Sequence, residues 1–337
     1  MVNGLLTIPI IISFILAFYA LPKWIKKCRE VGYLWEDMNK FPRVKNVAAS
    51  GGIIVVISFI LGVLVYIAIK TFILGQDDRT LQIFSLLTVI LILALVGFID
   101  DVLGWTHKGL SVKFRLFLAF VASVPLVVIN AGSKIIELPF FGLINLGILY
   151  PLVLIPIGIA GTATTYNFLA GFNGLEAGQG IIIISFLSFI AYKTDNPGLA
   201  VIGLCMVASL IIFYFYNKYP AKVFPGDVLT YSVGALIAGM AILGDFEKIA
   251  VFVFIPYIIE TFLKLRGRLE KSSFGKVNKD NSLELPFEKI YGLTHLSILI
   301  LKKFKKKVYE KDVVYLIFGF QIFICLTALI IFRNNLF

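Results

Sequence analysis

Charged residues are scarce in this chain. Lysine, arginine, aspartate and glutamate together make up 15% of its 337 residues, whereas hydrophobic residues make up 59%. In an average soluble domain about a quarter of the residues are charged. So few charges could not cover the apolar surface of a soluble fold of this length. The composition therefore excludes an ordinary soluble protein and indicates a polytopic membrane protein surrounded by membrane lipids.

Cysteine is rare as well, with three residues. Cys28, Cys205 and Cys325 are isolated along the chain and show no CxxC spacing, so they indicate neither a disulfide framework nor a metal site. The first apolar run, residues 4–21, has no basic segment before it and no small-residue cleavage site after it. We therefore expect a retained helix there and not a removable signal peptide.

Long apolar runs alternate with polar loops throughout the chain. Runs of about 17–25 residues can cross the roughly 30 Å of hydrocarbon in a bilayer, and they must be helical because backbone polar groups there need internal partners. The sequence predicts an all-α fold of about ten transmembrane helices in one transmembrane domain, residues 1–337. The expected helices cover residues 4–21, 47–69, 81–99, 112–131, 147–166, 178–192, 197–216, 228–244, 249–264 and 312–332.

The net charge of +11 could suggest a nucleic-acid partner, but the distribution of the charges indicates membrane topology instead. When successive loops are assigned to alternating sides, 25 of the 31 lysine and arginine residues fall on one side. The six on the other side are Lys70, Arg79, Lys134, Lys193, Lys248 and Arg333. The positive-inside rule then predicts cytoplasmic basic loops, including the long loop 264–311, and both termini outside. No nucleic-acid binding is expected.

The first of four polar motifs, GFIDDVLGWTHKG at residues 97–109, contains two adjacent carboxylates. Asp100 and Asp101 directly follow an apolar run, and Lys108 lies eight residues after Asp100. Two adjacent carboxylates repel each other unless a cation offsets them, and ionisable groups at membrane depth are functional by default. The alternative is a pair of helix-capping aspartates that faces water.

The second motif, NFLAGFNGLEAGQG at residues 167–180, is rich in glycine and has no cationic side chain. Such a loop could bind an anion only through backbone N–H groups or through a metal ion. Asn167 and Asn173 offer amide oxygens, which suit Mg²⁺, and the glycines let the backbone approach a ligand closely. The alternative is a tight re-entrant turn between two helices.

The third and fourth motifs allow two interpretations each. Asp227, in VFPGDVLTYSVGALIAG, opens a predicted helix and could cap it or hold a metal ion. Arg266 and Arg268, in KLRGRLEK, could bind a diphosphate through forked hydrogen bonds or merely flank a helix. All four motifs lie on the side rich in basic residues. Together they predict a cytoplasmic site for a magnesium-bound diphosphate.

Four segments carry a resemblance to a known family: GFIDDVLG…HK, NFLAGFNGLEAGQG, YPAKVFPGDVLTYSVGALIAG and PYIIETFLK. In this order they resemble the polyprenyl-phosphate N-acetylhexosamine-1-phosphate transferases. The likeness covers most of the chain and is greatest to the eukaryotic and archaeal branch, the dolichyl-phosphate N-acetylglucosamine-1-phosphotransferases. It implies ten helices and a cytoplasmic site. It also implies transfer of a sugar 1-phosphate, above all GlcNAc 1-phosphate, from a UDP-N-acetylhexosamine to polyprenyl or dolichyl phosphate, which releases UMP and begins glycan assembly.

The resemblance also implies roles for residues. Asn167 and Asp227 would bind Mg²⁺, for which Mn²⁺ could substitute. Asp100 and Asp101 match the catalytic aspartate pair, and Lys108 matches a lysine assigned to the lipid phosphate. The residues assigned to the UDP-sugar and its diphosphate are Asp37, Asn39, Lys40, Asn173, Gly174, Glu176, Arg266 and Arg268. Whether the aspartates act as a base, form a covalent intermediate or only organise the lysine and metal is left open.

The chain departs from the family pattern at two places. Family members often carry Pro-Glu where this chain has Ala48 and Ala49, so an acidic contact to substrate is expected to be absent. The histidine-rich loop of the peptidoglycan branch is missing too, and His295 stands alone, which favours a packing or interfacial role over that of a ligand.

Two rival functions are weaker. A membrane prenyltransferase would need a DDxxD motif, whereas DDVLG lacks its third aspartate. A secondary transporter with a broken helix at residues 171–180 would place its site near the bilayer midplane, and the polar motifs lie at helix ends. A multi-pass protein of the plasma membrane is expected. The sequence leaves the oligomeric state open, with a homodimer among the alternatives.

Overall fold

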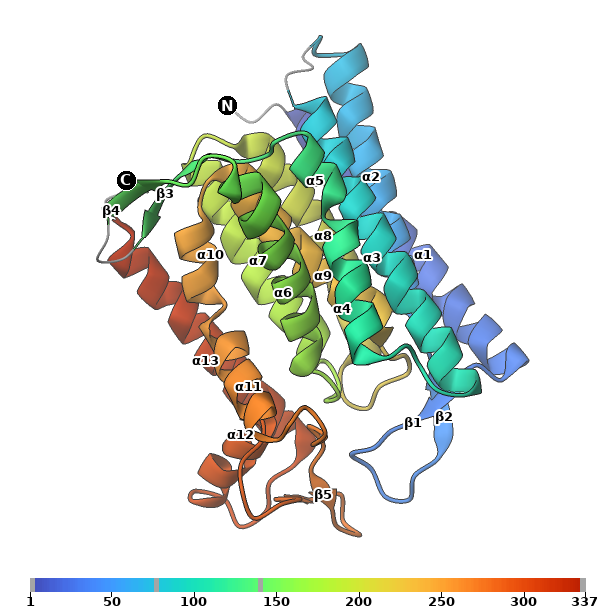
Figure 1. The fold of residues 1–337 in the computed structure, drawn as a ribbon. Helices are drawn as coiled ribbons and strands as arrows, with labels where there is room; N and C mark the ends of the chain where they lie inside the picture. Colours follow the sequence, from blue (N-terminus) through green and yellow to red (C-terminus); the bar gives the residue numbers. More distant parts are fainter. Residues whose placement is uncertain (1–3, 76–78, 139–141, 334–337) are drawn as a thin grey trace.

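The computed structural model of the chain describes residues 4–75, 79–138 and 142–333 (Figure 1). The apolar runs form helices that lie side by side in a bundle, and the connections between them gather at its two ends. In chain order the elements are η1 (Gly4–Thr7), α1 (Ile8–Val31), β1 (Leu34–Glu36), β2 (Lys45–Ala48), α2 (Gly52–Phe72), α3 (Thr80–Thr106), α4 (Val112–Ala122), α5 (Val124–Val128), β3 (Ile135–Leu138), β4 (Gly142–Asn145), the π-helical η2 (Tyr150–Leu154), α6 (Ile155–Phe168), α7 (Leu175–Lys193), α8 (Pro197–Asn217), α9 (Gly226–Gly244), α10 (Glu247–Val253), α11 (Ile255–Arg266), β5 (Lys276–Val277), β6 (Leu283–Glu284), α12 (Leu293–Lys302) and α13 (Glu310–Ile331).

Helix α9 forms the centre of the bundle. It packs against α3 and α6 most extensively and also contacts α2 and α7. Of its most apolar 18-residue window, 83% is buried, against 22% for the first helix and 33% for α13. The outer helices therefore expose large apolar faces, which in a soluble protein would be a liability and in a membrane protein contact lipid.

Seven helices of the described residues are long and apolar enough to cross a membrane. The other three predicted spans are each divided into two segments: α4 and α5, η2 and α6, α10 and α11. Proline stands at the start of the second segment in α5 (Pro125), α6 (Pro156) and α11 (Pro256). Proline lacks an N–H and clashes with the preceding turn, so it interrupts a helix. The polytopic helical fold is confirmed, and the number of ten remains a prediction.

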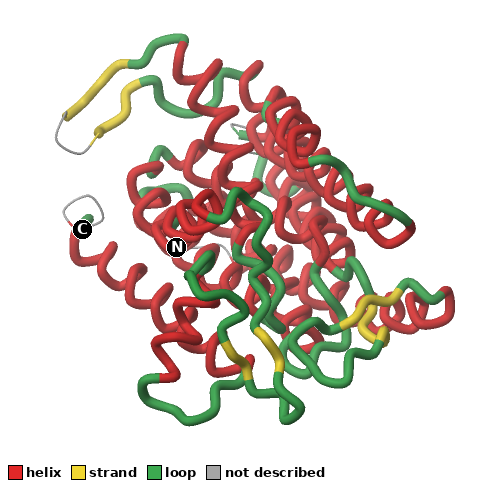
Figure 2. The backbone as a smooth tube through the Cα atoms, turned by 60° about the horizontal axis from the view of Figure 1, so that its bottom comes forward, coloured by secondary structure: helices red, strands yellow, loops and turns green. Residues whose placement is uncertain are grey.

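The chain is mostly helical, as predicted, and short strands accompany the helices. Three two-stranded antiparallel sheets, β1–β2, β3–β4 and β5–β6, lie in the connections between helices (Figure 2). Their strands have two to four residues each, which is too short to give the alternating pattern by which a strand is recognised in a sequence. They shape the loops at the ends of the bundle.

Several predicted boundaries also change, and the third helix continues from its expected end at residue 99 to Thr106. The first helix continues ten residues beyond the expected end at Leu21 and stops at Val31, where Gly32 takes the left-handed conformation with φ of 74°. The loop 264–311 is not all loop, because it contains α12 and the β5–β6 pair. His295 of α12 is fully buried, and its Nδ1 accepts the backbone N–H of Tyr291 at 3.3 Å. Burial lowers the pKa of this imidazole, and the full burial favours packing over an interfacial position.

Candidate active site

Three aspartates meet near one end of the bundle, where α3 and α9 touch. Asp100 and Asp101 lie in the last two turns of α3, and Asp227 is the second residue of α9. Gly97 allows this approach, since a Cβ there would lie 2.5 Å from the carbonyl carbon of Asp227. Any larger residue at position 97 would push α9 away from the aspartate pair.

Asp101 holds the start of α9. Its Oδ2 accepts the Ser50 hydroxyl and its Oδ1 accepts the backbone N–H of Asp227, both at 2.8 Å. Gly226 has a φ of 72°, and a Cβ on it would lie 2.1 Å from Asp101 Oδ2, so only glycine fits. Pro225, at the N-cap position, forms no side-chain cap. Asp101 therefore performs the capping that was one alternative for Asp227.

Arg115 of α4 bridges the other two carboxylates. Its Nη1 donates to Asp100 Oδ2 at 2.8 Å and to Asp227 Oδ2 at 2.9 Å. The side chains of Arg115, Asp100 and Asp227 are 25%, 11% and 21% exposed, so water screens them only in part and their charges must balance locally. We call Asp100, Asp101, Asp227 and Arg115 the aspartate cluster. The space between the Asp100 and Asp227 carboxylates is thus suited to a positively charged group.

A cavity of about 300 Å³ opens beside the aspartate cluster. Asn167 of α6, Asp227 and Tyr231 of α9, Arg115 of α4 and Lys264 of α11 contribute to its lining. The two predicted metal ligands, Asn167 and Asp227, are 60 positions apart in the chain and meet here because α6 packs against α9. The cavity therefore combines oxygen ligands with two basic side chains.

Lys264 is a basic residue of the cavity that the sequence motifs did not single out. It is 7% exposed, and its ammonium donates to Ser273 Oγ at 2.6 Å and to the backbone oxygen of Lys271 at 3.0 Å. Glu260 Oε1 lies 3.8 Å from the same nitrogen and forms an ion pair with it. The ammonium is held in place by the chain that follows α11.

Three basic residues with predicted roles lie outside this cavity. Lys108 is exposed in the connection between α3 and α4, next to Gly109, whose position would bring a Cβ within 2.6 Å of Asp100 Oδ1. Arg266 and Arg268 are exposed at and after the end of α11. Within residues 4–75, 79–138 and 142–333, these three side chains form no hydrogen bond or ion pair. Their assignments to the lipid phosphate and the diphosphate stay predictions.

A second polar cluster, which we call the loop network, consists of Asp37, Asn39, Lys40, Asn173 and Glu310. The Asn173 side-chain amide donates to Asp37 Oδ2 at 2.8 Å, and its backbone N–H donates to Glu310 Oε1 at 2.7 Å. The Asn39 amide donates to the same Glu310 oxygen at 3.2 Å. Lys40 Nζ lies 2.5 Å from Asp37 Oδ2. Loops from three parts of the chain are joined through these contacts.

The predicted substrate residues Gly174 and Glu176 shape the same region. Gly174 has a φ of 84°, and its N–H donates to Asn217 Oδ1 at 3.1 Å. Glu176 is buried, and its Oε1 accepts the N–H of Gly171 at 2.8 Å. Helix α7 then runs without a break from Leu175 to Lys193. The chain between α6 and α7 is therefore non-helical just before Leu175, and residues 175–180 belong to an unbroken helix.

Magnesium fits the donor chemistry of the aspartate cluster. Within the described residues, no three His, Cys, Asp or Glu side chains form a metal-binding group. Mg²⁺ is commonly bound by one or two carboxylates and completed by substrate phosphates and water. Asp227 and Asn167 supply hard oxygen atoms in the cavity wall, and the guanidinium between Asp100 and Asp227 shows that these oxygens favour a cation.

Comparison with known proteins gives one family. The model described as glycosyl transferase family 4 matches residues 83–245, which include Asp100, Asp101, Asn167 and Asp227 and end before Lys264.

Relatives match over a longer part of the chain. A protein of Saccharolobus solfataricus, provisionally named UDP-N-acetylglucosamine–dolichyl-phosphate N-acetylglucosaminephosphotransferase, is 34% identical over 327 residues, 96% of both chains. A Sulfolobus acidocaldarius protein of the same name is 31% identical, over 95% of this chain and 94% of its own. A phospho-N-acetylmuramoyl-pentapeptide-transferase of Wolbachia pipientis is 28% identical, over 74% of this chain and 78% of its own.

Proposed function

Because the chain belongs to glycosyl transferase family 4, we propose that it transfers N-acetylglucosamine 1-phosphate from UDP-N-acetylglucosamine to dolichyl phosphate or a similar polyprenyl phosphate and releases UMP. Two relatives that match almost the whole chain carry the corresponding name. The observation that carries the proposal is that Arg115 and Asp227 line one cavity and that Arg115 also binds Asp100 beside it.

Both substrates are anions, so the barrier to their reaction is chiefly electrostatic. An oxygen of the lipid phosphate attacks the β-phosphorus of the UDP-sugar, a new P–O bond forms, and the electron pair of the broken bond leaves with UMP. A phosphate monoester is largely a dianion near neutral pH, since its second pKa is about 6. The acceptor therefore needs no strong base, and positive charge around the cavity is the main requirement.

The side chains of the cavity would share this work. Asp227 and Asn167 would hold Mg²⁺, which when bound supplies a Lewis acid for the diphosphate, and Mn²⁺ would substitute for it. Arg115 and Lys264 would contact phosphate oxygens from two walls of the cavity. Asp100 orients Arg115, and Asp101 fixes the start of α9 and hence the position of Asp227.

The distribution of charges supports one orientation in the membrane. Lys108, Lys218 and Lys264 lie at the helix ends near the aspartate cluster, on the side that carries most of the basic residues. By the positive-inside rule this end would face the cytoplasm. We propose ten crossings, counting each divided span as one, with both termini outside and the plasma membrane as the location.

An assay of the purified protein tests the proposal. It contains Mg²⁺, a short polyprenyl phosphate and, in separate reactions, UDP-GlcNAc, UDP-GalNAc or UDP-MurNAc-pentapeptide, each radiolabelled in the sugar. We expect the fastest labelling of lipid from UDP-GlcNAc, with one UMP formed for each lipid product. Release of UDP in place of UMP would contradict the proposal, because it would mean that the sugar is transferred without its phosphate.

A further inference from the structure

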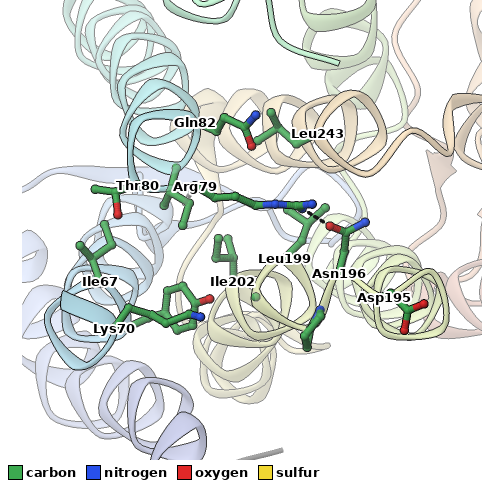
Figure 3. A pocket seen from close by; sticks show the side chains of 14 residues that line it. Ile67, Lys70, Arg79, Thr80, Gln82, Asp195, Asn196, Leu199, Ile202 and Leu243 are labelled. Atoms are coloured by element: carbon green, nitrogen blue, oxygen red, sulfur yellow. Dashed lines mark hydrogen bonds between the residues drawn. The ribbon is translucent and has the colours of Figure 1, made fainter. Parts of the chain in front are cut away.

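A second cavity, of about 250 Å³, lies at the opposite end of the bundle from the aspartate cluster, and Figure 3 shows it from close by. Lys70 near the end of α2, Arg79 before α3 and Asn196 before α8 help to line it. Helix α3 begins at this cavity with Thr80 and reaches the aspartate cluster at Asp100. At about 1.5 Å per residue, the two sites are about 30 Å apart along this helix. No small ligand can occupy both.

Two basic side chains line this cavity, at the end of the molecule where the sequence places few basic residues. Lys70 and Arg79 are two of the six basic residues that the sequence places on this side. The Arg79 guanidinium reaches across the cavity and donates a hydrogen bond to the Asn196 side chain (Figure 3). Among the described residues of the lining, Asp195 is the acidic one, and it lies on the far side of Asn196 from Arg79 (Figure 3).

These side chains suit a phosphate group. A guanidinium has five N–H donors in a planar fork that matches phosphate oxygens, and an ammonium adds a compact point charge. Thr80 and Gln82 contribute neutral hydrogen-bonding groups to the same lining. The chemistry favours an anion with several oxygen atoms.

The rest of the lining is apolar and suits a ligand that has an apolar part. Ile67, Ile83 and Leu199 form much of the remaining wall. Beside the cavity, Phe72 at the end of α2 and Leu81 at the start of α3 are 85% and 67% exposed. Pockets for complete small ligands usually measure about 300–1,000 Å³, so this cavity has room for a headgroup while the exposed apolar residues face lipid chains.

We propose that this cavity binds the headgroup phosphate of an anionic phospholipid, with Lys70 and Arg79 as the phosphate ligands and the acyl chains along the ends of α2 and α3. This site is separate from the transfer reaction and does not depend on the proposed function.

Native mass spectrometry of the detergent-solubilised protein tests this proposal with phosphatidylglycerol and phosphatidylcholine. The wild type should bind phosphatidylglycerol more tightly. The variant Lys70→Gln/Arg79→Gln should bind it about thirtyfold more weakly, because each cation near a membrane surface contributes about fivefold. The matched variant Lys134→Gln/Lys193→Gln removes two charges from the same side outside the cavity and should bind as the wild type does.

Several results would overturn the proposal. If the wild type bound both lipids equally, the proposal would be wrong, and this comparison does not require the double variant to fold. An equal loss of phosphatidylglycerol binding in the Lys134→Gln/Lys193→Gln control would also contradict it. Arg79→Lys retains the charge and should lose only about threefold, since it lacks the fork. Displacement of the lipid by millimolar glycerol 3-phosphate or inorganic phosphate would assign the cavity to a soluble phosphate instead.

Discussion

The aspartate cluster and the loop network contain the same kinds of side chain in different surroundings. In the aspartate cluster, Asp227 and Arg115 have 21% and 25% of their side-chain surface exposed, and they line a cavity of about 300 Å³. In the loop network, Asp37, Asn173 and Glu310 are between 2% and 4% exposed, and each is hydrogen-bonded to another member. A ligand can reach the first group directly, whereas it would have to break buried hydrogen bonds to reach the second.

The difference shows that a polar motif in a membrane protein can serve chemistry or loop architecture. Buried polar groups that hydrogen-bond to one another fix one arrangement of the chain; in the loop network Glu310 Oε1 accepts two N–H groups, and Glu310 Oε2 has no hydrogen-bond partner among the described residues. We infer that the loop network sets the shape of the loops around the cavity and that the aspartate cluster carries the reaction. Substitutions in the two groups should therefore act on different quantities, turnover in one and stability in the other.

Removal of the negative charge of the Asp227 carboxylate should have the largest effect on turnover. Asp227→Asn keeps the size of the side chain but weakens the proposed metal site, and we expect kcat to fall about a thousandfold, as for loss of a strong transition-state contact. The assay is UMP release at limiting Mg²⁺. The matched control is Asp245→Asn at the other end of α9, where the carboxylate accepts the Ser133 N–H at 2.8 Å. If Asp227→Asn retained a tenth of the activity, the metal assignment would be wrong.

Arg115→Gln should have the next largest effect. It removes the charge that joins Asp100 to Asp227, and we expect kcat/KM for the UDP-sugar to fall about a hundredfold. Arg115→Lys should recover part of the loss as a point charge. A comparison with Arg266→Gln decides whether the main diphosphate ligand is Arg115 of the cavity or Arg266 of the KLRGRLEK motif. A greater loss in Arg266→Gln would mean that the exposed arginine is the main diphosphate ligand.

Lys108→Ala should act on the acceptor and more weakly. A single lysine at a membrane surface contributes about 1 kcal/mol to anion binding, so we expect about fivefold weaker binding of polyprenyl phosphate. Calorimetric titration with each substrate separately measures the change, and exposed Lys113→Ala is the control. A loss of UDP-sugar affinity with unchanged lipid binding would assign the lysine to the donor instead.

Glu310→Ala should change turnover least. It leaves the Asn173 and Asn39 N–H groups without their acceptor, and each unsatisfied buried donor costs about 1–3 kcal/mol of unfolding free energy. We expect a lower unfolding temperature and a kcat within about threefold of the wild type at temperatures where the variant is folded. Glu310→Gln keeps an acceptor oxygen and should be milder. An unchanged unfolding temperature with lost UDP-sugar affinity would place the network in substrate binding.

The helices could be predicted because a bilayer demands long apolar runs, and such runs dominate this sequence. The interruptions at Pro125, Pro156 and Pro256 were readable in principle, since proline is a known breaker. The two-stranded sheets were not, because strands of two to four residues have no period.

Which residues lie together near the cavity could be predicted from the sequence better than which contacts they form. Asp100, Asp101, Asn167 and Asp227 share one side of the predicted membrane, so the sequence could group them. Their contacts depend on the close approach of α3 and α9 at Gly97, which a sequence does not display.

Three side chains of the cavity and the loop network could not be predicted from the sequence, because their sequence signals are ordinary. Arg115 and Lys264 look like the basic flanks of helices, and Glu310 looks like an acidic first turn of α13. The only local cue for Arg115 is Ser111, which caps α4 by accepting the Phe114 N–H at 3.3 Å and so places Arg115 in the early turns. Packing of distant helices gives each of the three its role.

Electron paramagnetic resonance of Mn²⁺, used in place of Mg²⁺ with UDP-GlcNAc present, tests the central claim most directly. The account predicts a protein-bound Mn²⁺ signal in the wild type and in Glu310→Gln, and its loss in Asp227→Asn. Retention of bound Mn²⁺ by Asp227→Asn, or its loss in a folded Glu310→Gln, would contradict the assignment of the metal-dependent chemistry to the aspartate cluster.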